Sequence, residues 1–144
     1  MKRGRLLVVL LLLLAGSGVQ LSAQPTDAER KQFKTVQAKA DKGDAEAQLE
    51  LAMLYTSGIG VTADPVKATK LLRKAAEQGL ARAQCLLGLN YANGVGVKED
   101  KIEAARWLYK ASVQGLAEGQ FDLAMCYLNG EGVNQDPTEA AVWL

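Results

Sequence analysis

The sequence predicts an all-α fold, an α-α superhelix in which helical hairpins stack as a solenoid, and two observations support this prediction. The first is an internal repeat of 36 residues, which keeps its register from Gly43 through Gly79 to Gly115. The second is that each repeat has two stretches with apolar residues at helical spacing, separated by a Gly-x-Gly-Val connector. Because one hairpin cannot bury its apolar face alone, neighbouring hairpins must stack.

The repeat divides most of the chain into units that align without a gap. Residues 43–78 and 79–114 form two full units, and residues 115–144 form a third that is incomplete by six residues. Identical residues occupy these columns: Gln48/Gln84/Gln120, Tyr55/Tyr91/Tyr127, Asp64/Asp100/Asp136, Gly58/Gly94/Gly130, Gly60/Gly96/Gly132 and Val61/Val97/Val133. Another column holds only small residues, Ala52, Gly88 and Ala124, and predicts close approach of two helices.

Each unit is predicted to form a first helix, a glycine turn and a second helix. In the first unit Gly58 ends the first helix, because glycine readily adopts the left-handed conformation there. Asp64 then caps the second helix, with Pro65 at its first position. Glutamates three residues after Asp100 and Asp136 have the spacing of a capping box. The second helices are expected to bury Ala68, Leu71, Leu72 and Ala75, then Ala104, Trp107, Leu108 and Ala111, then Ala140, Trp143 and Leu144.

The repeated pattern A-x-x-Q-x-x-L-(A/G)-x-x-Y-x-x-G-x-G-V-x-x-D resembles the Sel-1-like repeat, a relative of the tetratricopeptide repeat. The resemblance extends over Gly43–Leu144. It implies a right-handed superhelix that acts as an adaptor for protein complexes, with the first helices on its concave side. Family members rich in cysteine suggest the alternative, a β-lactamase-like or peptidoglycan-binding protein of the cell envelope. Those members have a cysteine pair within each repeat, which this chain lacks.

Residues 1–23 have the three-part pattern of a secretory signal peptide. The basic segment Met1–Arg5 precedes the apolar run Leu6–Ala15, and small and polar residues follow up to Ala23. The alternative is an uncleaved membrane anchor, but the run has about half of the roughly 20 apolar residues that a span needs. The sequence therefore predicts a periplasmic or secreted protein with no membrane span after cleavage.

Residues 24–42 are expected to form a helix that covers the first hairpin. Thr26 or Asp27 is its expected cap, and Val36 and Ala40 fall one period before Leu72 and Ala76. Its charged residues Arg30, Lys31, Lys34 and Lys39 are expected to be exposed.

The charge balance argues against nucleic acid as a partner. The chain has 17 basic and 16 acidic residues, for a net charge of +1. Residues 1–23 hold three basic and no acidic residues, so their removal changes the net charge to −2. Because no basic stripe remains, we expect no nucleic-acid binding.

The residue types also limit the chemistry. The chain has no histidine, which removes the histidine-dependent nucleophilic sites and the usual histidine zinc sites. Four carboxylates on the first helices are candidates for general acid–base catalysis. They are Glu46, Glu50, Glu118 and Asp122. The alternative is that they are solvated charges on the helix surface. We expect no catalytic, cofactor or metal site, and hence no enzyme activity.

Cys85 and Cys126 are expected to be free and largely buried. They lie on first helices of adjacent units, five positions out of step. That offset corresponds to about 7.5 Å along a helix, in addition to a separation of roughly 8–10 Å between the helices. Because a disulfide needs Cα atoms within about 7 Å, we expect the two cysteines to be too far apart to form one.

The repeat also separates packing columns from a variable stripe. Positions advancing by 4, 3 and 4 residues share one face of the first helices, and this face changes between units. It is the predicted binding surface for a protein or peptide, formed by Glu46, Glu50, Met53 and Ser57, then Arg82, Leu86, Leu89 and Asn93, then Glu118, Asp122, Met125 and Asn129. The alternative is that Met53, Leu89 and Met125 only fill gaps between units. The last helix lacks a polar cap, which predicts a second contact at the C-terminal end with a partner or a second copy. The alternative is that the chain is part of a longer repeat array.

Overall fold

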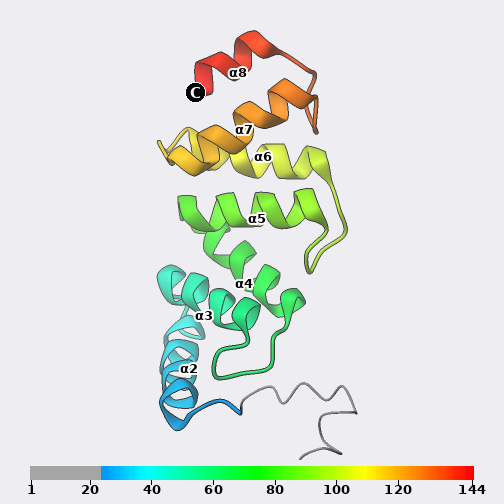
Figure 1. Cartoon of the computed structure of the whole chain (residues 1–144). Helices are drawn as coiled ribbons and strands as arrows, with labels where there is room; N and C mark the ends of the chain where they lie inside the picture. Colours follow the sequence, from blue (N-terminus) through cyan, green and yellow to red (C-terminus); the bar gives the residue numbers. More distant parts are fainter. Residues whose placement is uncertain (1–23) are drawn as a thin grey trace, which may run out of the picture.

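The computed structural model describes residues 24–144, which form seven α-helices and no strand, so the predicted all-α fold is confirmed. The helices follow one another in a stack from α2 to α8, and each packs mainly against its neighbours in sequence (Figure 1). Their bounds are α2 Asp27–Ala40, α3 Ala45–Ser57, α4 Pro65–Glu77, α5 Ala81–Asn93, α6 Lys101–Ser112, α7 Ala117–Asn129 and α8 Pro137–Trp143. The predicted signal peptide lies outside the described residues. None of the helices described is long and apolar enough to cross a membrane.

The helix ends lie where the repeated residues predict them. Asp64, Asp100 and Asp136 cap the second helices, each accepting a hydrogen bond from a backbone N–H of the first turn. Gly58 and its equivalents in the other two units end the first helices in the left-handed conformation, with φ of 66–69°. Each unit therefore fixes its own helix boundaries through local hydrogen bonds and backbone geometry.

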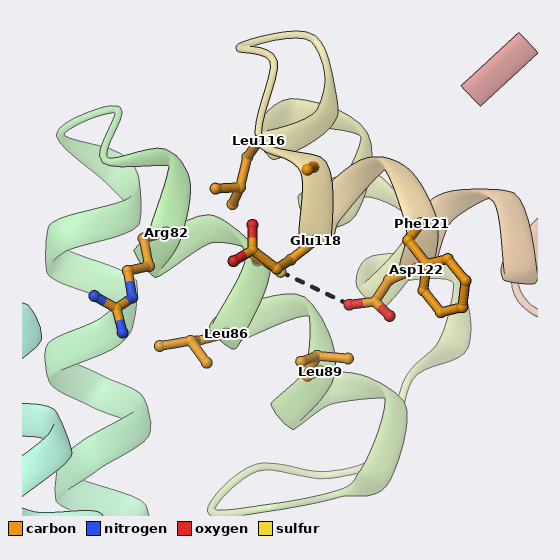
Figure 2. Close-up of a pocket in the computed structure, with 9 residues that line it drawn as sticks. Arg82, Leu86, Leu89, Leu116, Glu118, Phe121 and Asp122 are labelled. Atoms are coloured by element: carbon orange, nitrogen blue, oxygen red, sulfur yellow. Dashed lines mark hydrogen bonds between the residues drawn. The ribbon is translucent and has the colours of Figure 1, made fainter. Parts of the chain in front are cut away.

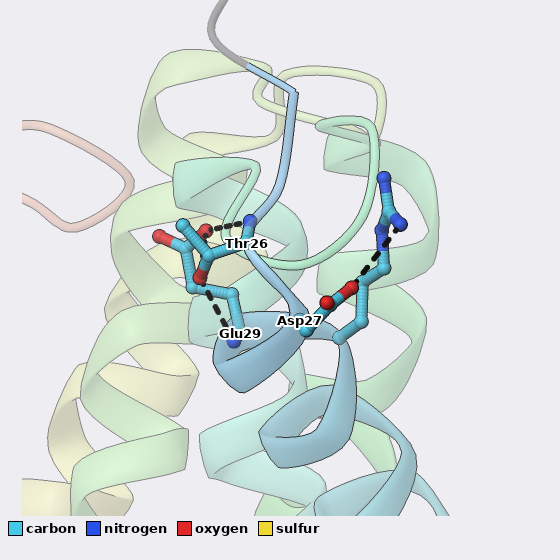
Figure 3. Close-up of polar contacts among 4 residues, drawn as sticks. Thr26, Asp27 and Glu29 are labelled. Carbon is cyan, nitrogen blue, oxygen red and sulfur yellow. Dashed lines mark hydrogen bonds and ion pairs between the residues drawn. The ribbon is translucent and has the colours of Figure 1, made fainter.

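The capping boxes differ from the prediction. Glu103 accepts a hydrogen bond from Arg106 at 3.2 Å, and Glu139 accepts one from Trp143 Nε1 at 3.3 Å. Neither side chain returns to the backbone of its capping aspartate, because that N–H already donates at 2.9 Å to a carbonyl of the preceding helix, Tyr91 for Asp100 and Tyr127 for Asp136. The complete capping box is at Thr26 (Figure 3), whose backbone N–H donates to the Glu29 carboxylate at 2.7 Å.

The buried residues of the second helices follow the prediction, with three exceptions. Leu71 and Trp143 are half-buried, and Leu144 is 73% exposed because it lies beyond the last residue of α8. Val36 and Ala40 of α2 are buried like their equivalents in α4, so residues 27–40 continue the packing pattern of the repeat.

The small column permits close helix contact, as expected. A Cβ atom added to Gly88 on α5 would lie 2.9 Å from Leu108 Cγ and 3.1 Å from the Ala104 carbonyl oxygen of α6. The two helices of this unit therefore pack at a distance that excludes even a methyl group at position 88.

The second glycine of each connector packs against the preceding unit. A Cβ atom at Gly60 would lie 2.5 Å from the Glu29 carbonyl oxygen, and one at Gly96 would collide with the Pro65 carbonyl oxygen. Gly132 approaches the Lys101 carbonyl in the same way. The connector is therefore a contact between units as well as a turn.

The repeated glutamines join successive units through hydrogen bonds. Gln84 is buried; its Nε2 donates to the Ala76 carbonyl at 3.1 Å, and its Oε1 accepts from Gln114 Nε2 at 2.7 Å. Gln48 makes the equivalent bonds with the Ala40 carbonyl and with Gln78. Each of these buried amides thus connects its first helix to the second helices before and after it.

Candidate partner-binding groove

A pocket of about 570 Å³ lies between the first helices of the second and third units. We call it the α5–α7 pocket, and it is lined by Arg82, Cys85, Leu86, Leu89, Leu116, Ala117, Glu118, Phe121 and Asp122. Apolar side chains form most of its walls, and charged groups from α5 and α7 face one another across it (Figure 2). Such a combination suits a ligand with both apolar and charged parts.

A second pocket of about 240 Å³ lies between α3 and α5. This α3–α5 pocket is lined by Ala52, Met53, Thr56, Ser57, Pro65, Ala68, Leu72, Arg82, Leu86, Asn90 and Val95. Arg82 and Leu86 belong to both pockets. The two pockets are therefore contiguous and form one groove along the first helices.

The predicted stripe lies partly in this groove. All twelve of its side chains are exposed or half-buried. Those that line the groove are Met53, Ser57, Arg82, Leu86, Leu89, Glu118 and Asp122. Those that line neither pocket are Glu46, Glu50, Asn93, Met125 and Asn129. Ligand binding by any of them stays a prediction, as does the contact at the C-terminal end.

Several groove residues lie outside the predicted stripe. The second helix α4 contributes Pro65, Ala68 and Leu72 to the α3–α5 pocket, and the start of α7 contributes Leu116. Phe121 of α7 also lines the α5–α7 pocket and is 56% exposed, although its column holds the buried Leu49, so the column gave no signal for it. The spacing of residues along one helix identifies the face they share, but it does not identify the residues of the neighbouring helix that line the other side of the groove.

A polar contact forms part of the α3–α5 pocket. Asn90 Nδ2 donates to Thr69 Oγ1 at 2.8 Å, and that hydroxyl donates to the Val95 carbonyl at 2.9 Å. Asn90 stands where the other units have Leu54 and Cys126. The contact connects α5 with α4 and holds the connector in place beside the pocket.

Three charged side chains in the α5–α7 pocket have no ion-pair partner within residues 24–144: Arg82, Glu118 and Asp122. The polar partner of Asp122 is the Cys85 thiol, whose Sγ lies 3.8 Å from Oδ2. The groove therefore presents charges that the described part of the chain leaves free for a ligand.

The surroundings of Asp122 and Cys85 disfavour their charged forms. Burial raises the pKa of Asp122, the Glu118 carboxylate raises it further, and the hydrogen bond from Cys85 opposes both effects. Burial, together with the Asp122 carboxylate, raises the pKa of Cys85 to about 11. Burial likewise raises the pKa of Cys126.

We predict that Asp122→Asn increases the free energy of unfolding at pH 7. A carboxyl whose pKa is raised in the native state contributes stability when protonated, and this contribution is lost as pH rises from about 4 through the raised pKa. Asparagine removes the charge but keeps an oxygen that can accept from Cys85. Urea denaturation at pH 7 and pH 3.5 tests this: the gain should shrink at the lower pH, and a less stable variant at pH 7 would contradict it.

Both cysteines are free and buried, as the column analysis predicts. Thiolate is the reactive form, so a buried thiol with a raised pKa reacts slowly. We predict that neither Cys85 nor Cys126 is labelled by a thiol reagent at pH 7 within the time that a free cysteine takes to react completely. Both should react after denaturation in urea, and rapid labelling of the folded protein would show that their burial is wrong.

The groove has the features of a binding surface. No group of three or more cysteine, aspartate or glutamate side chains within residues 24–144 could hold a metal ion. Of the four carboxylates considered for acid–base chemistry, Glu118 and Asp122 line one pocket, while Glu46 and Glu50 line neither. At neutral pH the Cys85 thiol is protonated and a poor nucleophile.

Comparison with known proteins identifies the repeat. The Sel1 repeat model matches three consecutive segments, residues 45–80, 81–116 and 117–144. These segments begin two residues after the units defined by Gly43, Gly79 and Gly115 and have the same period. No curated protein matches the chain.

Solved structures show the same fold. A protective antigen present in uropathogenic Escherichia coli strains, with an SLR fold, is 40% identical over 77% of this chain, with a TM-score of 0.75. A Sel1 repeat protein from Oxalobacter formigenes is 32% identical over 79%, also with a TM-score of 0.75. This chain spans 24% and 47% of those two proteins. Helicobacter pylori cysteine rich protein B, 24% identical, shares the fold over 79% of this chain and 84% of its own, with a TM-score of 0.65.

Proposed function

The chain belongs to the Sel1 repeat family, and we propose that it is a non-catalytic scaffold that holds a segment of a partner protein in the groove along α3, α5 and α7. The observation that carries this proposal is the continuity of the groove, since Arg82 and Leu86 line both of its pockets. A continuous groove accepts a length of chain, whereas two isolated pockets would each accept a small molecule.

Differences between the units support the proposal. The columns that form the core and the connections between units are nearly constant, because every unit packs in the same way. The groove columns change: Glu46 is replaced by Arg82 in the next unit, and Leu86 by Asp122. Packing does not fix these columns, so they are free to vary to suit a ligand.

The apolar part of the groove would supply most of the affinity. Leu86 and Leu89 are half-buried and Met53 is 44% exposed, so a bound segment would remove their remaining apolar surface from water. The charged groups around them would select the segment and its direction.

We predict that Leu86→Lys weakens capture of peptides from a random twelve-residue phage-displayed library at least about tenfold, because it places a charge where both pockets meet. Val113→Lys is the matched control, since Val113 is 56% exposed and lines neither pocket. Circular dichroism should show unchanged helix content in both variants. Equal capture by Leu86→Lys and the unmodified protein would refute groove binding, and hydrolysis of a chromogenic β-lactam would refute a non-catalytic role.

We also propose that the scaffold acts outside the cytoplasm. Support comes from the basic, apolar and small-residue segments of residues 1–23. Mass spectrometry of the protein isolated from its native cells should give an N-terminus near Gln24. Recovery from the cytoplasm with Met1 retained would contradict export.

A further inference from the structure

We propose that the α5–α7 pocket recognises a lysine or arginine side chain of the bound segment, an inference that rests on the groove binding proposed above. Glu118 and Asp122 both line this pocket, and neither has a cationic partner within the described residues. The apolar walls and the two carboxylates match the two parts of a long basic side chain.

The apolar walls suit the hydrocarbon part of such a side chain. Leu86 and Leu89 of α5 and Leu116 at the start of α7 are half-buried and face the pocket (Figure 2). Lysine and arginine place their methylene groups along apolar surface while their charged ends reach polar groups. The leucines would thus contact the methylene groups.

The carboxylates suit the charged end. Glu118 and Asp122 are four residues apart on α7, so their side chains share one helix face, and like charges at this spacing repel. A cation bound between them would replace this repulsion with two attractive interactions. The exposed ring of Phe121 lies beside Asp122 (Figure 2) and adds an aromatic surface to which a cation can bind.

The state of Asp122 without a ligand supports the same conclusion. Burial raises the pKa of its carboxyl group, and the hydrogen bond from the Cys85 thiol, a weak donor, opposes this rise without cancelling it. A basic side chain in the pocket would supply the missing positive charge. Asp122 therefore lowers stability in the free protein in a way that a cationic ligand would reverse.

The other half of the groove lacks this arrangement. At the α3–α5 pocket, Arg82 and Leu86 stand in the columns that hold Glu118 and Asp122 at the next pocket. Arg82 lines both pockets, but two carboxylates line the α5–α7 pocket with it, whereas no acidic residue lines the α3–α5 pocket. At the α3–α5 pocket Arg82 therefore repels a cation and attracts a carboxylate or a backbone carbonyl. The bound segment is thus expected to place its basic residue between α5 and α7, with an apolar side chain between α3 and α5.

The test is a selection from the same phage-displayed library on the purified protein. The double variant Glu118→Gln/Asp122→Asn removes both charges with little change in shape. Glu77→Gln is the control, because Glu77 is an exposed acid that lines neither pocket. The affinity of the most enriched peptide is then measured by fluorescence anisotropy.

Peptides selected by the unmodified protein are expected to share one lysine or arginine next to apolar residues. Their affinity should fall about tenfold or more in the double variant, as for loss of a hydrogen bond to a charged group, and stay unchanged in Glu77→Gln. Peptides that need Leu86 but show no basic residue, or bind the double variant equally well, would overturn the basic-residue inference and leave groove binding intact. Failure to select any peptide that depends on Leu86 would overturn the groove itself.

Discussion

Gly96→Ala is expected to lower the free energy of unfolding by about 2–5 kcal/mol. Gly96 has φ of +64°, and the left-handed conformation costs alanine about 1–2 kcal/mol. The added methyl group would also collide with the Pro65 carbonyl oxygen and lie 2.7 Å from Thr69 Oγ1. Such overpacking typically costs a further 1–3 kcal/mol or so. The methyl group meets backbone atoms of Pro65, so a change of side-chain rotamer cannot relieve the collision.

Gly94→Ala is the matched control for this effect. Gly94 has φ of +66°, close to that of Gly96, but its Cβ would meet only ordinary contacts at 3.4 Å and beyond. It should therefore show the conformational cost alone, about 1–2 kcal/mol. Urea denaturation followed by circular dichroism compares the two variants. Equal losses of stability would mean that Gly96 does not hold successive units together.

Gln84→Ala is expected to lower the free energy of unfolding by about 2–3 kcal/mol. The substitution leaves the buried Ala76 carbonyl without its side-chain donor and removes the acceptor for Gln114. The Ala76 carbonyl keeps the bond from the Gly79 backbone N–H, so the cost is that of two lost side-chain hydrogen bonds, at roughly 1–1.5 kcal/mol each. Because the two bonds connect α5 with the helices on either side, the loss should also reduce the cooperativity of unfolding between units.

Gln120→Ala provides the comparison within the same column. Gln120 is half-buried and donates to the Ser112 carbonyl at 3.3 Å. Losing this single bond should cost about 1 kcal/mol. Thermal unfolding of both variants distinguishes the roles of the two glutamines. If Gln120→Ala is as destabilising as Gln84→Ala, the bond between Gln84 and Gln114 contributes little.

Much of the fold could be predicted because each unit encodes its own helix ends. Aspartate before proline and glycine after the last turn act locally, so their effect can be inferred without knowing the neighbouring units. The capping boxes of Asp100 and Asp136 were wrong because the backbone N–H of each aspartate donates to the carbonyl of Tyr91 or Tyr127 instead. The connector glycines and column glutamines were recognised as repeated, but their contacts across units depend on how the units pack.

The groove could be predicted only in part, for a related reason. Helical periodicity placed Arg82, Leu86 and Asp122 on one accessible face, and the structure brings them to a shared pocket. Periodicity along one helix carries no information about what lies opposite it. Leu72 and Leu116 could therefore be assigned to the groove only from the relative positions of the helices in the structure.

The most direct test of the central claim, that the groove along α3, α5 and α7 binds a protein segment, is amide NMR mapping with the most enriched library peptide. If the groove binds the peptide, its addition will shift the resonances of Arg82, Leu86 and Leu89 and of their neighbours across the groove. Exposed residues away from the groove, such as Val113, should remain unchanged. Shifts confined to surfaces outside the two pockets would contradict groove binding.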